Sequence, residues 1–217
     1  ELLITNSFIP LEEGTPSITS EVLVLAAPYW NDLRNKLLKV VDSYHQTYPL
    51  RRGIPREELK SRLKLPSRVF NGVMKKLSLD QSLTEYSAYL AKPEHEIRFD
   101  NRQESRVGAL MQKFEQNPFS PPSIKECQSE VGEEVLNALV EIKELILLSP
   151  DVIFRKQDYE FMKSKVQELL VQREKITLAE VRDLFNTSRK YAQAFLEHLD
   201  TVGITRRDGD FRRVGKQ

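Results

Sequence analysis

The chain has 217 residues, of which 40% are hydrophobic and 30% charged, and its formal net charge is +1. This length is typical of one or two small globular domains, and the composition excludes collagen-like and low-complexity proteins. No apolar run approaches the roughly 18 residues of a membrane helix, and the single cysteine, Cys127, permits no internal disulfide, so we expect a cytoplasmic protein with no membrane partner.

The first predicted elements are two β-strands. The chain begins with Glu1 rather than Met, which indicates a part cut from a longer protein. Residues 2–5 and 21–25 are rich in β-compatible side chains and are separated by a long polar loop. We therefore expect residues 1–27 to form a small hairpin.

Three later segments repeat one pattern, in which a helical stretch precedes a short amphipathic helix, a tight turn and a longer amphipathic helix. The initial stretches span 30–44, 102–114 and 159–170, and the helix pairs span 56–77, 123–139 and 178–196. Leu59, Cys127 and Val181 occupy the same apolar position of the short helix. We therefore interpret Cys127 as a buried core residue and not as a reactive thiol.

Each helix pair is followed by a predicted β-hairpin, most clearly where Asp208 and Gly209 separate two β-compatible runs. Three helices and a hairpin, with a tight turn between the last two helices, define the winged-helix variant of helix-turn-helix. We predict a mainly α chain with small β-hairpins (α+β), built from tandem winged-helix domains in an extended arrangement. These domains span 28–97, 98–156 and 157–217, and 1–27 is the remnant hairpin of a preceding unit.

Motifs for catalysis, nucleotide binding and metal binding are missing from the sequence. No P-loop, Gly-x-Gly-x-x-Gly or Gly-x-Ser-x-Gly pattern is present. His45, His95 and His198 are far apart in the sequence and share no ligand spacing. We therefore expect a chain that is not an enzyme and that holds no cofactor or metal.

Charge is unevenly distributed along the chain. Residues 45–76 carry nine Lys and Arg against two acids, residues 80–160 carry nine against sixteen, and residues 161–217 carry twelve against eight. Basic clusters are the usual footprint of nucleic-acid binding, although a charged run is often only a solvated surface. The sequence therefore predicts two candidate anion-binding regions on either side of an acidic middle.

The last unit has the stronger candidate site. Thr187 or Ser188 is placed to cap the third helix, which puts Arg189 and Lys190 in its first turn, where free N–H groups attract phosphate. Tyr191 follows, either to stack on a base or to pack in the core. The hairpin adds further cations around its turn. The predicted site residues are Ser188, Arg189, Lys190, Tyr191, Arg206, Arg207, Gly209, Asp210, Arg212 and Arg213.

Two strings resemble bacterial selenocysteine-specific translation elongation factors of the SelB type. They are SRKY at 188–191 with TRRDGDFR at 205–212, and YHQTYPLRRGIPREEL at 44–59. The resemblance spans roughly 28–217 and implies that the last domain binds an mRNA hairpin, the selenocysteine insertion element, beside a UGA codon. The residues at the start of the third helix and on the wing would face the RNA. The family often has an apolar residue where this chain has Asp208, and a lysine where it has Phe211.

The resemblance also implies a parent protein with an N-terminal GTPase domain, absent here, which would hold GTP and Mg. We expect a monomer. The ribosome and selenocysteyl-tRNA would be partners through that parent. On this basis we expect residues 157–217 alone to retain most of the hairpin affinity.

The residues alone are also compatible with two other functions. A tandem winged-helix regulator would place a recognition helix in the major groove of DNA, for which the third helix offers few base-reading groups beyond its start. A protein-interaction scaffold would fit the acidic residues of 98–156. A comparison of hairpin RNA with duplex DNA separates the nucleic-acid functions, and binding to neither favours the scaffold.

Overall fold

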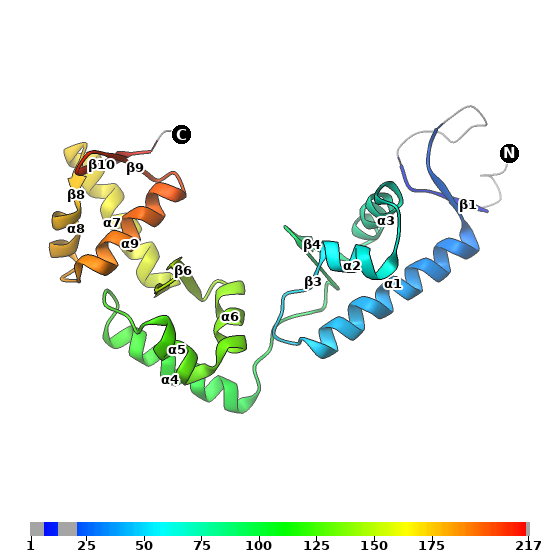
Figure 1. The fold of residues 1–217 in the computed structure, drawn as a ribbon, viewed down its shortest axis with the longest axis horizontal. Coiled ribbons are helices and arrows are strands. Elements are labelled where there is room, and N and C mark those ends of the chain that lie inside the picture. The colour runs from blue at the N-terminus through cyan, green and yellow to red at the C-terminus, as the bar shows by residue number, and fades with distance from the viewer. Residues whose placement is uncertain (1–6, 13–20, 216–217) are drawn as a thin grey trace. The chain divides into compact units, whose positions relative to one another are not determined.

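The computed structural model describes residues 7–12 and 21–215 and divides the chain into two compact units, unit 1 (Glu1–Arg98) and unit 2 (Phe99–Gln217) (Figure 1). The prediction of a mainly α chain with small antiparallel sheets is confirmed. No helix among the described residues is both long and apolar enough to cross a membrane. The finer domain boundaries, including the one between residues 156 and 157, stay predictions.

Unit 1 begins with a two-stranded antiparallel sheet and continues with three helices and a three-stranded sheet. Its elements are β1 (Phe8–Pro10), β2 (Val24–Ala26), α1 (Ala27–Thr47), β3 (Ile54–Pro55), α2 (Arg56–Leu63), α3 (Ser67–Leu79), β4 (Thr84–Tyr86) and β5 (Tyr89–Ala91). The later sheet has the order β3-β5-β4, and all its pairs are antiparallel. The strand predicted over 2–5 lies outside the described residues, and β2 pairs instead with β1.

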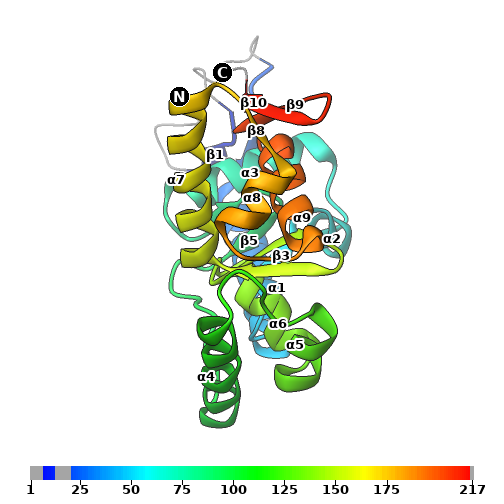
Figure 2. The same cartoon turned by 90° about the vertical axis from the view of Figure 1, so that its left-hand side faces the viewer.

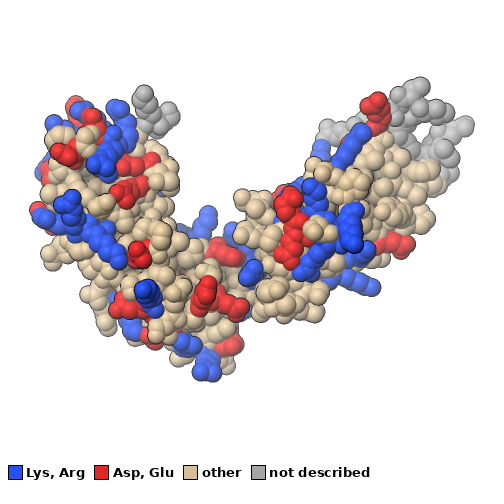
Figure 3. Space-filling model, in the orientation of Figure 1, with Lys and Arg blue, Asp and Glu red and all other residues tan. Residues whose placement is uncertain are grey.

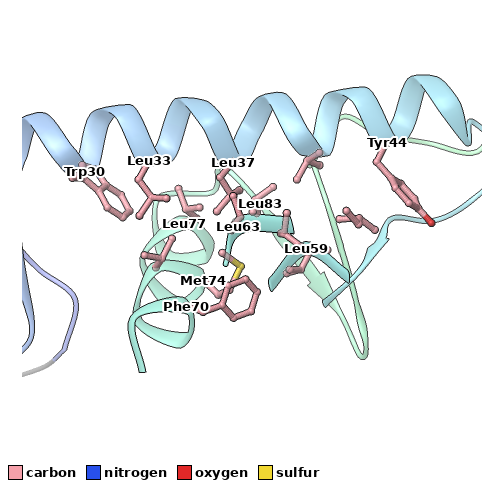
Figure 4. Packing of buried hydrophobic residues seen from close by; sticks show 14 of the residues in the cluster. Trp30, Leu33, Leu37, Tyr44, Leu59, Leu63, Phe70, Met74, Leu77 and Leu83 are labelled. Carbon is pink, nitrogen blue, oxygen red and sulfur yellow. The ribbon is translucent and has the colours of Figure 1, made fainter. Parts of the chain in front are cut away.

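The core of unit 1 lies along one face of α1. Leu33, Leu37 and Val41 recur every four residues and are buried, as the helical repeat requires for a single apolar stripe. Figure 4 shows this stripe facing Phe70 and Leu77 of α3 and residues of α2. The long helix thus holds the α2–α3 pair and its flanking strands in place.

Unit 2 contains two helix-and-hairpin segments in succession. Its elements are α4 (Asn101–Gln116), α5 (Ile124–Val131), α6 (Glu133–Glu141), β6 (Leu145–Ser149), β7 (Val152–Arg155), α7 (Lys156–Arg173), β8 (Ile176–Thr177), α8 (Leu178–Leu184), α9 (Arg189–Thr201), β9 (Thr205–Asp208) and β10 (Phe211–Val214). β6 pairs with β7, and the last sheet has the order β8-β10-β9. In Figure 2 this last sheet lies beside the ends of α7 and α9.

Local sequence sets where several of these helices begin. Ser123 and Thr177 each form a capping box, in which the hydroxyl accepts the N–H of Glu126 or Glu180 and that glutamate accepts the N–H of the cap residue. Gly132 joins α5 to α6 with a φ of 85°, a conformation that L-residues rarely adopt. Burial of Cys127, predicted from the repeat, is confirmed, and it raises the pKa of the thiol to about 11.

The hairpin of the first segment of unit 2 packs into the hydrophobic core of the second. Val152 and Phe154 of β7 are almost fully buried and belong to the same cluster as Tyr159 of α7 and Phe195 of α9. The hairpin of the first segment therefore supplies part of the core beneath the last helix.

Candidate nucleic-acid interface

The start of α9 carries two exposed cations. Arg189 and Lys190 occupy its first turn, and within the described part of the chain neither pairs with a carboxylate. Of the two candidates Thr187 and Ser188, Ser188 is the N-cap residue, but its side chain makes no capping hydrogen bond. Cations in a first turn oppose the helix dipole, and uncapped N–H groups there attract anions. An anionic ligand bound at the helix start therefore offsets the unfavourable interaction between these cations and the helix dipole.

Tyr191 has internal partners. Its hydroxyl donates a hydrogen bond to the Pro121 carbonyl oxygen at 2.8 Å, and its ring meets that of Phe154 edge-on at a centroid distance of 6.0 Å. Burial raises the pKa of this half-buried phenol. Of the two uses considered for the ring, base stacking and packing, these contacts favour packing.

The wing arginines divide between the two faces of the β9–β10 hairpin, as strand alternation requires. Directly paired residues share a face, so Arg207 lies on the same face as Arg212, and Arg206 on the same face as Arg213. Arg212 is only 4% exposed because its face covers the core, where its Nε donates to Asp200 Oδ2 at 2.7 Å. The structure thus separates Arg212 from the other three, which lie at or near the surface.

The remaining wing side chains surround the turn. Arg206 and Arg207 donate to the carbonyl oxygens of Val214 and Gly209, at 3.3 and 3.1 Å, so these contacts leave their charge without a carboxylate partner. Arg213 instead pairs with Asp208 at 2.6 Å. Gly209 supplies the positive φ of the turn, 61°, and Asp210 beside it is exposed. Figure 3 shows Lys and Arg side chains at this end of unit 2, interspersed with Asp and Glu.

Asp208 and Phe211 face each other across the hairpin, where they pair in the strand register. The Lys175 ammonium lies 4.2 Å from the centroid of the Phe211 ring, a cation–π contact. Lys175, which precedes β8, therefore brings a positive charge close to the wing.

The basic run over 45–76 has a different arrangement, because most of its arginines have partners inside unit 1. Arg68 forms a bidentate pair with Glu12 at 2.7 Å for each bond, and this pair lowers the pKa of Glu12 to about 2. Others pair with carboxylates or lie over aromatic rings. These contacts are Arg51 with Tyr44 and Tyr48, Arg52 with Tyr86, Arg56 with Glu85, and Arg62 with Glu58.

Two histidines that are far apart in sequence meet in unit 1. The rings of His45 and His95 stack at a centroid distance of 3.6 Å. His45 Nε2 accepts the Lys92 N–H at 3.3 Å, and His95 Nε2 lies 2.8 Å from the Arg51 carbonyl oxygen. Burial and the neighbouring His95 lower the pKa of His45 to about 4. No group of three or more metal-ligating side chains gathers anywhere in the described residues.

The fold and these surfaces define a class: a tandem winged-helix protein in whose last segment Arg189, Lys190, Arg206 and Arg207 pair with no carboxylate of the described residues. Comparison with known families matches "Elongation factor SelB, winged helix" twice, at residues 38–91 as the second such domain and at 168–214 as the third. These two stretches therefore match winged-helix domains of the SelB elongation factors, the family that the sequence resembles.

Individual relatives agree with this assignment. The chain is similar to selenocysteine-specific elongation factors of Desulfomicrobium baculatum (26% identity, 89% of this chain, 32% of the relative) and Haemophilus influenzae (21%, 84% and 31%). It also resembles the crystal structure of a bacterial selenocysteine-specific elongation factor, EF-Sec, with a TM-score of 0.51, 18% identity and coverage of 92% of this chain and 32% of that one. The chain thus spans about a third of the length of these relatives.

Proposed function

We propose that this chain is the RNA-binding region of a selenocysteine-specific elongation factor and that its last winged-helix domain recognises the mRNA hairpin that marks a UGA codon for selenocysteine. The assignment to SelB winged helices supports the class of target. The observation that carries the proposal is the uncapped start of α9, where Arg189 and Lys190 are exposed without carboxylate partners. Arg206 and Arg207 on the wing add two more such cations.

The face of α9 favours RNA over duplex DNA. Beyond the first turn its exposed polar groups include Gln193 and Glu197, and these bind each other, with Gln193 Nε2 donating to Glu197 Oε1 at 2.9 Å. A recognition helix in the major groove needs free donors and acceptors along its length. Hairpin RNA instead presents phosphates and unstacked loop bases, which a cationic helix start and a wing can contact.

The proposal extends to the domain plan and to the parent protein. We infer winged-helix domains over 28–97, 98–156 and 157–217, with 1–27 as the end of a preceding unit. In the parent, a GTPase domain would bind GTP and Mg, and the ribosome and selenocysteyl-tRNA would be partners. In this chain the proposed contacts to RNA come from the predicted site residues that remain at the surface.

A binding titration tests the proposal directly. The chain is titrated against hairpins from UGA-containing selenoprotein messages and against duplex DNA of equal length, each at several salt concentrations. We expect one class of hairpin to bind at least tenfold more tightly than the DNA, a difference of about 1.4 kcal/mol. Equal binding of all these nucleic acids, or binding of none, would contradict the proposed function.

A further inference from the structure

The loop between α4 and α5 lies against the start of α9. The Thr187 hydroxyl donates a hydrogen bond to the Phe119 carbonyl oxygen and also lies 3.2 Å from the Ser120 hydroxyl. The Tyr191 hydroxyl donates to the Pro121 carbonyl oxygen at 2.8 Å. The two residues that flank Ser188, Arg189 and Lys190 are therefore both bound to one segment, residues 119–121, which we name the brace loop.

The brace loop is itself anchored in the core of unit 2. The Phe119 ring stacks on Phe161 of α7 at a centroid distance of 6.0 Å and packs against Phe185, which follows α8, at 5.1 Å. Phe185 is 4% exposed and in turn meets Phe195 of α9 edge-on. The loop thus contacts α7, the end of α8 and the start of α9 together, so its position is coupled to all three helices.

This anchoring replaces the usual way of fixing a helix start. An N-cap side chain normally holds the first turn, but Ser188 makes no such bond, and the Thr187 hydroxyl is bound to the brace loop. Asn186, just before, has a φ of 45°, so the turn into α9 uses a conformation that other residues rarely adopt. Contacts from outside the helix therefore hold the first turn of α9 in its orientation.

We propose that the brace loop positions the RNA site: its bonds to Thr187 and Tyr191 hold the first turn of α9 so that Arg189 and Lys190 point outward in a fixed geometry. This inference rests on the proposed function and adds positioning residues to it. A preordered site loses less conformational freedom on binding, so removing the brace weakens binding without removing a contact to RNA.

Because Val152 and Phe154 also belong to the core beneath α9, the binding module is 99–217. This differs from the expectation that residues 157–217 suffice.

The test compares two substitutions of one residue in the full chain. Thr187→Val keeps the shape of the side chain and removes the hydroxyl, whereas Thr187→Ser keeps the hydroxyl and is the matched control. We expect Thr187→Val to weaken binding of the preferred hairpin by about tenfold, and Thr187→Ser to bind like the unmodified chain. The slope of log affinity against log salt stays unchanged in both, because no phosphate contact is lost.

A second variant, Tyr191→Phe, removes the other bond to the brace loop and keeps the ring, so it is informative even if Thr187→Val does not fold. We expect a weakening of at least threefold with the same unchanged salt slope. Affinities equal to that of the unmodified chain for both variants would overturn the positioning role. So would a salt slope reduced as far as in Arg206→Ala, since Thr187 would then act through a phosphate contact. Failure of the unmodified chain to prefer any hairpin would instead overturn the proposed function.

Discussion

The two basic regions of this protein differ in what their cations contact. Residues 45–76 have the denser run of Lys and Arg, yet arginines there pair with carboxylates or lie over aromatic rings of unit 1. In the last segment of unit 2, Arg189 and Lys190 are exposed without carboxylate partners among the described residues. The difference teaches that the density of positive charge in a sequence does not measure the charge that is available to a ligand.

Two of the carboxylate partners of the first region come from elsewhere in the chain. Glu12, which follows β1, binds Arg68, and Glu85 of β4 binds Arg56. In the last segment the nearby acids are occupied differently: Asp200 binds the buried Arg212, and Asp208 binds Arg213. The placement of a few acids thus decides which of these arginines are neutralised inside the fold.

The largest expected effect concerns Arg212, the wing arginine that binds a carboxylate inside the fold, as arginines of unit 1 do. Asp200→Ala removes its partner and leaves a buried charge uncompensated, and we expect a loss of about 3 kcal/mol in the free energy of unfolding. Denaturant unfolding of the chain measures this loss. Asp208→Ala is the matched control, because it breaks the exposed pair with Arg213 and costs about 1 kcal/mol or less. Similar losses for the two variants would place Arg212 with the surface arginines.

The next effect concerns specificity. Arg189→Ala removes an unpaired cation from the helix start, where a loop base can meet both a guanidinium plane and N–H donors. We expect the preference for the cognate hairpin over a loop variant to fall by about 1–3 kcal/mol. Gln193→Ala, further along the same helix, is the control and leaves that preference unchanged. If Arg189→Ala weakens both hairpins equally and also reduces the salt slope, Arg189 binds only phosphate.

The histidine pair gives unit 1 a pH dependence. The pKa of His45 in the folded chain is about 4, below its ordinary value of 6.5, so between these values the unfolded chain binds the extra proton. Stability is therefore complete above about pH 6.5 and falls as the pH drops toward 4, by at most about 1.4 kcal/mol per pH unit. The groups around His45 are Asp42, Lys92, Glu94 and His95.

Unfolding of the chain at pH 7 and at pH 5 measures this dependence. His45→Gln removes the titrating ring, and we expect it to flatten the unit 1 transition over this range. An unchanged pH profile in that variant would assign the dependence to another group.

The smallest effect separates the two basic regions in one experiment. Arg206→Ala removes an unpaired wing cation and is expected to weaken all RNAs about equally, while the salt slope falls by roughly 0.7–0.9. Arg68→Ala removes an arginine that already binds Glu12, and we expect no change in the affinity or the slope. An equal fall in the salt slope for both variants would remove the distinction between the regions.

Local patterns in the sequence were sufficient for most of the fold. The helix predicted over 30–44 lies within α1 (Ala27–Thr47), and the hairpin predicted at Asp208 and Gly209 is the turn between β9 and β10. These features depend on apolar spacing and turn chemistry over a few neighbouring residues, which is the range that a sequence pattern describes. The placement of Cys127 in a core followed from its position in the repeat.

Tertiary structure decided what each charged or aromatic residue contacts. No local signal connects Tyr191 to Pro121, Thr187 to Phe119, or His45 to His95, because 70, 68 and 50 residues separate the partners. The sequence predicted that side chains alternate between the two faces of the wing. It did not predict that the packing of this sheet within unit 2 buries Arg212 beside Asp200. The sequence by itself determined the helices and hairpins of this protein. Which cations remain for a ligand depended on long-range packing, because a charge is neutralised by whichever group the fold brings within a few ångströms of it.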